Sequence, residues 1–344
     1  GSLTYRYDSV EYAAAGYRMV YQGTPTIPIG GRDLPAGHSP WFSLLVAAPS
    51  YWALGREPGN PIYAVTLIAV AGILFAFGTG ASVSGMAGGS AAVLCVLATS
   101  GYRTWGREIT TDAPTAALFL AAAWFYVRQE GKALPDVRLL AGAGVATGLA
   151  TAFRSSSAIA ALPFILLLLR RGWARIPAAW LAVLLPVALA SAADATYNVR
   201  VFGSPFRNSY HFWTAVPYDY FHLTFSSIYF VDNVMQLRAA GGLALLALGL
   251  TGLLVLKRLK PGTPVDRGGV RAVWFYAAVA GGPLALLHLF FFYPDGRYFM
   301  PVVGLLAAAC GAVAGALLPR RWHWLGAVAL TIVLATAIRH RATH

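Results

Sequence analysis

Long apolar runs recur along the chain, and they constrain its fold more than any other feature. A transmembrane helix needs about 20 predominantly apolar residues, and residues 62–80 and 299–318 are two clear examples. Hydrophobic residues make up 58% of the 344-residue chain and charged residues only 11%, whereas soluble domains carry about 25% charged residues. The sequence therefore predicts an all-α polytopic membrane protein. It excludes a soluble enzyme, a secreted disulfide scaffold and a disordered tail.

The apolar runs predict about ten transmembrane helices, several of them short, at residues 62–80, 83–100, 113–127, 138–153, 156–169, 177–195, 239–256, 273–292, 299–318 and 324–338. The stretch from Leu139 to Leu169 is interrupted only by residues 154–157. A charged residue at the bilayer centre is costly, so we expect a tight hairpin at Arg154 and two spans there. Cys95 and Cys310 each lie inside an apolar run, so neither a disulfide nor a thiolate metal site is expected.

Residues 1–40 are too charged to cross a bilayer. Within them we expect a short helix over Ser9–Tyr21 and a loop rich in proline and glycine over Gly23–Gly37. Trp41–Leu54 is expected to lie in the membrane interface. The chain begins with Gly-Ser and has no methionine before Met19, so we expect a segment upstream to be missing. We expect four regions: a first outer loop with juxtamembrane helices (1–60), a catalytic transmembrane half (61–195), an outer loop capping the site (196–238) and C-terminal transmembrane helices (239–344).

The charged residues of the loops predict the orientation. Four short loops on one side hold 13 of the 26 basic residues, including all three lysines: Arg128, Lys132, Arg138, Arg170, Arg171, Arg175, Lys257, Arg258, Lys260, Arg267, Arg271, Arg320 and Arg321. By the positive-inside rule this side is cytoplasmic. Ten of the 13 acidic residues fall on the other side, so any chemistry is expected on the outer face. Because the basic residues are strung between apolar runs, the net charge of +13 reflects membrane topology and not nucleic-acid binding.

Two outer segments carry carboxylates. Asp8 and Glu11, spaced i and i+3, share one face if their segment is helical, and one of them could act as a general base. In the loop before the span at residue 113, Asp112 is either a helix cap or a catalytic group. Glu108 either pairs with a neighbouring arginine such as Arg107 or belongs to the site.

Two further outer segments offer polar, aromatic and cationic groups. The loop from residue 196 to 238 carries Asn198, Tyr210 and His211 among many aromatics, which either anchor the loop at the interface or contact substrate. Its histidines match no zinc-binding spacing, which leaves a metal role weakly supported. Two turns each place an arginine at the mouth of a span. One turn holds Arg154, and the other holds Arg297 beside Tyr298. Such an arginine snorkels to lipid headgroups or meets an anion such as a phosphate.

The chain contains no Walker loop, dinucleotide fingerprint or nucleophile elbow. Carboxylates and arginines beside a membrane suit a substrate that is both anionic and lipid-anchored, such as a polyprenyl-phosphate sugar. A transporter or flippase for an anionic lipid or small solute is the alternative. Such a protein would have ionisable residues near the bilayer midplane and two matching halves, and the sequence shows neither. A non-catalytic scaffold of related architecture, or a polymer-chain ligase, is a third interpretation.

Several motifs resemble the GT-C superfamily of polytopic glycosyltransferases, which includes protein O-mannosyltransferases and aminoarabinose transferases. They are Asp8–Tyr12 followed by Gly23, His38-Ser39-Pro40, Arg107–Pro114, Asn198 with Phe202–Pro205 and Tyr210, and Gly296–Tyr298. In that family a first transmembrane helix precedes the catalytic aspartate, which here matches Asp8, so eleven spans are expected. The resemblance also gives Asp112 a role in the site.

The resemblance implies transfer of one sugar from an outward-facing polyprenyl-phosphate donor to a hydroxyl acceptor, with inversion and without a nucleotide. Asp8 would deprotonate the acceptor, and Glu11 or Glu108 would orient it or bind a divalent metal, so a metal cofactor is left open. Arg297 and Arg154, with Arg107, would hold the phosphate. The expected location is a bacterial plasma membrane with the site outside. The expected partners are the donor, membrane lipids and a lipid, glycan or protein acceptor.

Overall fold

The computed structural model describes residues 7–212, 218–258 and 266–318. In this part of the chain four helical segments are long and apolar enough to cross a membrane: α4 (Pro61–Ala98), α9 (Pro177–Phe202), Arg267–Leu289 and Gly296–Leu317. A fifth arises if Ser227–Ala239 and Gly242–Arg258, bent by 71°, form one span. The all-α polytopic class is confirmed, but the predicted count of about ten spans is not. The expected span at 324–338 lies outside the described residues.

The longest helix contains a reversal that separates two predicted spans. Inside α4, Ser84 and Gly85 leave the helical region, and Gly85 adopts a φ of +62° that favours glycine. A Cβ added at Gly80 would collide with the backbone of Gly88, although these residues would stand about 12 Å apart in a straight helix. The chain therefore turns back on itself at Ser84 and Gly85, which are the second and third residues of the predicted span 83–100, so the second span begins later than predicted.

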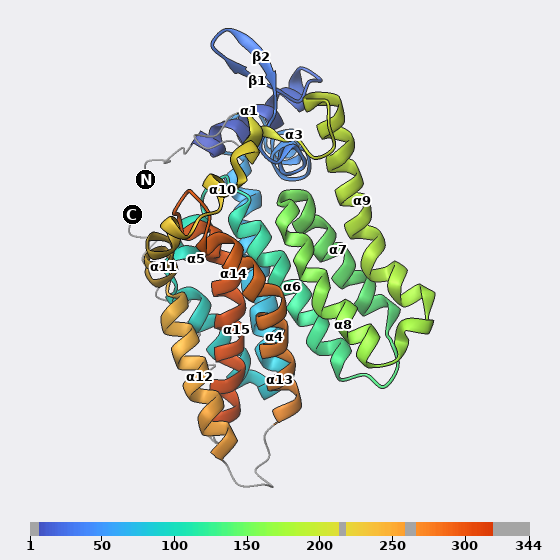
Figure 1. Cartoon of the computed structure of the whole chain (residues 1–344), viewed down its shortest axis with the longest axis vertical. Helices are drawn as coiled ribbons and strands as arrows, with labels where there is room; N and C mark the ends of the chain where they lie inside the picture. Colours follow the sequence, from blue (N-terminus) through green and yellow to red (C-terminus); the bar gives the residue numbers. More distant parts are fainter. Residues whose placement is uncertain (1–6, 213–217, 259–265, 319–344) are drawn as a thin grey trace.

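Helix α15 (Met300–Leu317) lies at the centre of the bundle, and most of its residues are buried. Glycines allow its backbone to approach α4 closely, because a Cβ at Gly311 would collide with the backbone of Ala92, and one at Gly315 with that of Gly88. Around this pair stand α6 (Asp112–Glu130), α12 (Gly242–Arg258) and α13 (Arg267–Tyr276), as Figure 1 shows. A π-helical turn, η7 (Ala277–Gly281), joins α13 to α14 (Gly282–Leu289).

A hairpin forms at Arg154, as the sequence predicts. Helix α7 (Val137–Phe153) ends there because Arg154 is extended, and a 3-10 turn, η2 (Ser155–Ala161), leads into α8 (Leu162–Arg170). A short turn, η3 (Trp173–Arg175), precedes α9. Helix α9 packs along α7, where Gly144 and Gly148 face the α9 backbone without room for a Cβ. Arg154 thereby stands at one end of the pair formed by α7 and α9.

The N-terminal region forms a cap at the upper end of the molecule in Figure 1. Helix α1 (Tyr7–Tyr21) confirms the predicted helix, but the predicted loop over Gly23–Gly37 instead contains a hairpin of β1 (Thr26–Ile29) and β2 (Arg32–Pro35). Gly30 and Gly31 both have positive φ, which suits the tight turn of a two-residue hairpin. Three consecutive helical segments follow: α2 (Pro40–Phe42), η1 (Ser43–Ala47) and α3 (Ala48–Leu54).

Of the remaining outer segments, the end of α9 and η4 (Ser209–His211) contact this cap, through Tyr197 and Tyr210. Helix α9 continues seven residues beyond the predicted span to Phe202. After it come η4 (Ser209–His211), η5 (Tyr218–Tyr220), α10 (Phe221–Thr224), η6 (Ser227–Tyr229) and α11 (Phe230–Ala239). Helix α5 (Ser100–Trp105) and the turn η8 (Gly296–Phe299) complete the upper end.

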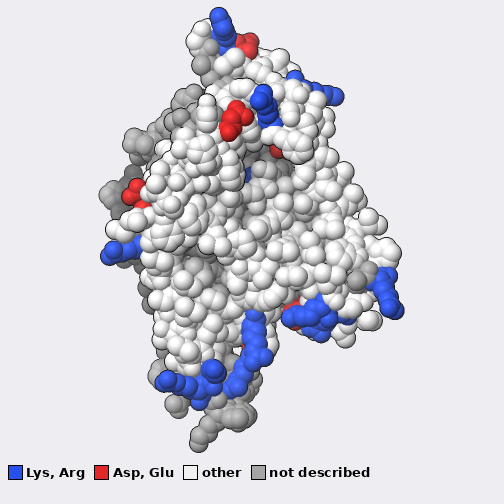
Figure 2. All heavy atoms as spheres, viewed as in Figure 1, with Lys and Arg blue, Asp and Glu red and all other residues white. Residues whose placement is uncertain are grey.

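Charged side chains separate to the two ends of the molecule. The face in Figure 2 carries mainly lysines and arginines at its lower end and both signs of charge at its upper end. The surface between is mostly uncharged, apart from charged groups at its left edge. The turns after α6 and α8 and the C-terminal end of α12 lie toward the lower end in Figure 1. These segments carry exposed basic residues such as Lys132, Arg171 and Lys257. The mostly uncharged surface between the two ends is the surface that a bilayer would cover.

Candidate active site

A cavity of about 420 Å³ lies beneath the N-terminal cap, at the end of the bundle opposite these basic turns. Figure 2 shows the molecule hollowed below its upper end. Segments from the whole chain line the cavity: α1, the residues before α2, the α7–η2 turn, α9, the outer loop, α14 and η8. Among the residues predicted for the site, it brings together Asp8, Arg154, Asn198, Tyr210, Arg297 and Tyr298.

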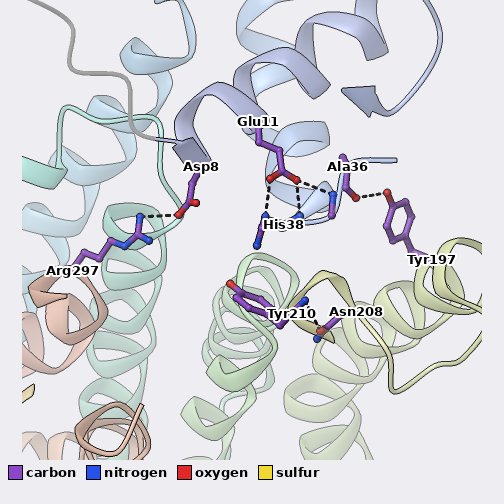
Figure 3. Close-up of polar contacts among 9 residues, drawn as sticks. Asp8, Glu11, Ala36, His38, Tyr197, Asn208, Tyr210 and Arg297 are labelled. Carbon is purple, nitrogen blue, oxygen red and sulfur yellow. Dashed lines mark hydrogen bonds and ion pairs between the residues drawn. The ribbon is translucent and has the colours of Figure 1, made fainter. Parts of the chain in front are cut away.

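Asp8 and Arg297 form an ion pair at the edge of this cavity. Asp8 lies in the first turn of α1, where a carboxylate interacts favourably with the helix dipole. Its Oδ2 lies 2.8 Å from Nη1 of Arg297 in η8, as Figure 3 shows. The Arg297 side chain is only 9% exposed, and Asp295 lies 3.5 Å from its Nε. One guanidinium therefore stands between two carboxylates.

Asp112 and Arg154 form a second, more deeply buried pair. Asp112 is 1% exposed, and its Oδ1 lies 2.8 Å from Nη2 of Arg154. Helix α6 begins at Asp112 after the N-cap residue Thr111, which makes no side-chain capping bond, so Asp112 serves as an ion-pair partner and not as the cap. The two arginines meet at Tyr298, because Arg154 lies 4.8 Å and Arg297 5.0 Å from its ring centroid. Arg297 also donates to the Tyr298 hydroxyl.

Glu11 holds the chain segment at residues 37–38. Its Oε1 accepts hydrogen bonds from the backbone N–H groups of Gly37 and His38, and its Oε2 lies 2.7 Å from Nδ1 of the His38 ring (Figure 3). Burial lowers the pKa of His38, but the hydrogen bond and charge of Glu11 and the charge of Asp8 outweigh burial, so the pKa is raised. Glu11 thus acts behind the cavity wall.

The segment after His38 is tied to the arginine hairpin. Among the described residues Ser39 alone combines a side chain with a positive φ, of 41°, and such a conformation is uncommon outside glycine. Its hydroxyl donates to the carbonyl of Phe153, 2.7 Å away, in the residue before Arg154. The first outer segment is therefore held against the end of α7.

The outer loop contributes an aromatic wall. Tyr210 stacks on Tyr218 with ring centroids 5.0 Å apart, and the His38 ring lies edge-on to Tyr210 at the same distance. Burial raises the pKa of Tyr218 to about 12, which keeps its hydroxyl protonated at neutral pH. The Asn208 side chain accepts from the Tyr210 N–H and starts the turn η4 (Figure 3). Asn198 lines the cavity and donates to Asp194.

Five predicted site residues lie outside the cavity lining. Two of them, Glu11 and Asp112, are the buried ion-pair partners described above. Arg107 is exposed, Glu108 is half-buried in the loop before α6, and His211 is bonded to Asn208 within its own turn. The cavity also contains residues that the sequence did not single out for the site, notably His288 and Tyr218. His288 lies within an apolar run, where one histidine gives no local signal.

The carboxylates of the site do not gather into a metal centre. Among the residues the structure describes, no group of three or more His, Cys, Asp or Glu side chains could hold a metal ion. Asp8, Asp112 and Glu11 each have a different partner, namely Arg297, Arg154 and His38. These residues do not fit a metal cage, and we derive no step through a metal.

The fold and the cavity define a multi-pass helical membrane protein whose cavity pairs carboxylates with arginines at one end of the bundle. Residues 41–193, a little under half of the chain, match the family model described as dolichyl-phosphate-mannose-protein mannosyltransferase. The chain also shares its fold with ArnT from Cupriavidus metallidurans. Together these findings confirm the resemblance to the GT-C membrane glycosyltransferases.

Two solved ArnT structures match the chain. The one bound to undecaprenyl phosphate has a TM-score of 0.64 and 16% sequence identity, over 97% of this chain and 60% of that one. The apo structure has a TM-score of 0.61 and 17% identity, over 97% and 59%. The chain therefore spans about 60% of the length of these proteins. No curated protein matches the sequence.

Proposed function

We propose that the protein is an integral membrane glycosyltransferase that transfers a sugar from a polyprenyl-phosphate donor to a hydroxyl acceptor, with inversion, on the outer face. The observation that carries this proposal is the cavity that holds the Asp8 carboxylate beside the guanidinium groups of Arg297 and Arg154. A similar fold, that of ArnT, has been solved with bound undecaprenyl phosphate, which supports this donor class.

The arginines supply the binding site for the donor phosphate. Guanidinium groups bind phosphate bidentately, and a buried cation stabilises the charge that develops on a leaving phosphate. Arg297 and Arg154 meet at the Tyr298 ring, so both can face one phosphate. Asp8 and Asp112, which pair with these arginines, balance their charges.

Asp8 acts as the general base. It takes the proton of the acceptor hydroxyl as that oxygen bonds to the anomeric carbon of the sugar. The bond from this carbon to the phosphate oxygen breaks on the opposite side, and polyprenyl phosphate leaves with both electrons, which inverts the configuration. Asp8 is 25% exposed, so a hydroxyl can reach it. Glu11 positions His38, whose ring packs edge-on against Tyr210 in the cavity wall.

We propose that the cavity end faces outward from a bacterial plasma membrane. The positive-inside rule, applied to the basic residues of the loops on the other side, supports this orientation. The acceptor is a hydroxyl of a lipid, a glycan or a protein. The assay is run with and without a divalent metal, because a metal can bind together with the donor.

The first experiment measures sugar transfer by the full-length protein in nanodiscs with radiolabelled undecaprenyl-phosphate sugars, with and without EDTA. Asp8→Asn removes the base but keeps the side-chain volume, so turnover should fall by at least about 100-fold. Asp33→Asn is the matched control, because Asp33 is 60% exposed and pairs with Arg18 far from the cavity. It should retain full turnover.

Unchanged turnover in Asp8→Asn would remove Asp8 from the mechanism. If the wild type turns over none of the donors but moves them across liposome membranes, the protein is a flippase and the proposal is wrong.

A further inference from the structure

His288 is a buried histidine that the proposed chemistry leaves without a role. It lies in the last turn of α14, is 8% exposed and lines the cavity. Its ring stacks on Tyr298 with centroids 5.3 Å apart and an interplanar angle of 14°. Phe291 and Phe299 contact the same ring from their edges. Packing therefore holds the imidazole in one orientation, which suits a group that recognises a ligand.

The hydrogen bond of His288 determines its tautomer. Nδ1 lies 2.8 Å from the carbonyl oxygen of Leu284, and a carbonyl can only accept, so Nδ1 carries the proton. A second proton would add a positive charge to a buried site that already holds Arg154 and Arg297, which Coulomb repulsion opposes. Nε2 is therefore an unprotonated nitrogen with a lone pair. It has no hydrogen-bond partner among the described residues.

A lone pair on Nε2 accepts a hydrogen bond and cannot donate one. An ionised phosphate offers no hydrogen and is repelled by such an atom, whereas a sugar hydroxyl donates to it. Aromatic rings that suit the apolar face of a sugar lie on the same wall, since Tyr218, Phe225 and Phe291 also line the cavity. The cavity thus has arginines for the phosphate and a neutral histidine for a hydroxyl.

We infer that His288 accepts a hydrogen bond from one hydroxyl of the donor sugar through Nε2 and so distinguishes the sugar-loaded lipid from bare polyprenyl phosphate. This inference rests on the proposed function. It assigns His288 to donor specificity and gives it no part in bond breaking.

Two substitutions separate this role from a structural one. His288→Asn places an amide N–H near the position of Nδ1 and keeps the bond to Leu284, but it has no group at the position of Nε2. His288→Gln reaches the Nε2 position with an amide oxygen and gives up the Leu284 bond. If Nε2 recognises the sugar, His288→Gln should keep the preference for the sugar-loaded lipid and His288→Asn should lose it. If His288 only supports the local structure through its bond to Leu284, His288→Asn should keep the preference and His288→Gln should lose it.

The measurement is the dissociation constant of undecaprenyl phosphate and of its mannose, glucose and galactose derivatives for the full-length protein in nanodiscs. Wild type should bind one sugar-loaded lipid more tightly than the bare lipid. His288→Asn should lose about tenfold or more of the affinity for that lipid, as expected for one lost hydrogen bond in a buried site, and none for the bare lipid. His288→Gln should keep most of the preference.

A test in the wild type covers the case in which His288→Asn does not fold. Among donors in which one hydroxyl of the preferred sugar is replaced by hydrogen, one should bind the wild type about tenfold or more weakly than the parent donor. If every deoxygenated sugar binds as well as the parent, or if folded His288→Asn keeps the wild-type preference, the inference is wrong and the proposed function stands. If the wild type binds none of these lipids, the proposed function and the inference fail together.

Discussion

Asp8, Asp112 and Glu11 face one physical problem, because a carboxylate taken out of water needs a partner. Asp112 is almost completely buried and pairs with Arg154, Asp8 pairs with Arg297, and Glu11 accepts three hydrogen bonds from residues 37 and 38. Each pair joins segments far apart in the chain. At the residue scale the sequence predicts which groups are charged and near the membrane surface, but it does not predict these pairs.

The His38–Glu11 contact gives the protein a pH-dependent stability. The folded-state pKa of His38 is raised above the unfolded value of about 6.5, so the stabilisation is complete below that value and is lost as pH rises through the raised pKa. We expect the apparent melting temperature of the wild type to fall between neutral and alkaline pH more steeply than that of Glu11→Gln. Thermal unfolding in detergent at a series of pH values measures both proteins. If their melting temperatures fall in parallel as the pH rises, the prediction is wrong.

Glycine placement decides packing at the scale of elements. Helix α15 lies against α4 because Gly311 and Gly315 leave no side chain between the two backbones, and α4 itself turns back at Gly85. The sequence predicts two spans near 62–80 and 83–100 from their hydropathy, and the reversal agrees with this prediction. Which glycines face which backbone depends on tertiary packing, since small residues occur on several faces of these helices.

Gly311→Ala tests this close approach. Its methyl group would collide with the backbone of Ala92, which cannot move aside as a flexible side chain can, so we expect the protein to be destabilised by about 1–3 kcal/mol. Gly282→Ala is the matched control, because no atom lies within 4 Å of the Cβ position there. Thermal unfolding of both variants checks the prediction. Equal melting temperatures would show that α15 and α4 are not in this register.

Charge separation between the two ends is the dominant feature of the whole molecule. The turns after α6 and α8 and the C-terminal end of α12, which carry Lys132, Arg171 and Lys257, lie toward the lower end in Figure 1. The N-terminal cap, which contributes to the cavity lining, lies at the upper end. None of the residues that line the cavity belongs to the described parts of the predicted basic loops. Lys260, Arg320 and Arg321 lie outside the described residues. The distribution suits one orientation in a membrane with an inside-negative potential.

Cysteine labelling tests this orientation. In a Cys95→Ser, Cys310→Ser background, we expect Arg32→Cys to react with a membrane-impermeant maleimide in intact bacterial spheroplasts. Lys132→Cys should react only after permeabilisation, because the basic end is expected to face the cytoplasm. Both positions are exposed, so access to the reagent differs only by side. Labelling of Lys132→Cys alone in intact spheroplasts would reverse the topology and place the cavity inside.

The sequence by itself determined the membrane class, the helical architecture, the segregation of basic residues into loops and six of the polar residues that line the cavity. These properties follow from local composition, since hydropathy and loop charge act without knowledge of distant segments. Only the tertiary structure decided that Asp8 meets Arg297, that Asp112 pairs with Arg154 and does not cap its helix, and that His288 joins the cavity. Each of these depends on helices separated by many residues, whose packing is set by close contacts such as those of Gly311, and no local pattern encodes those contacts.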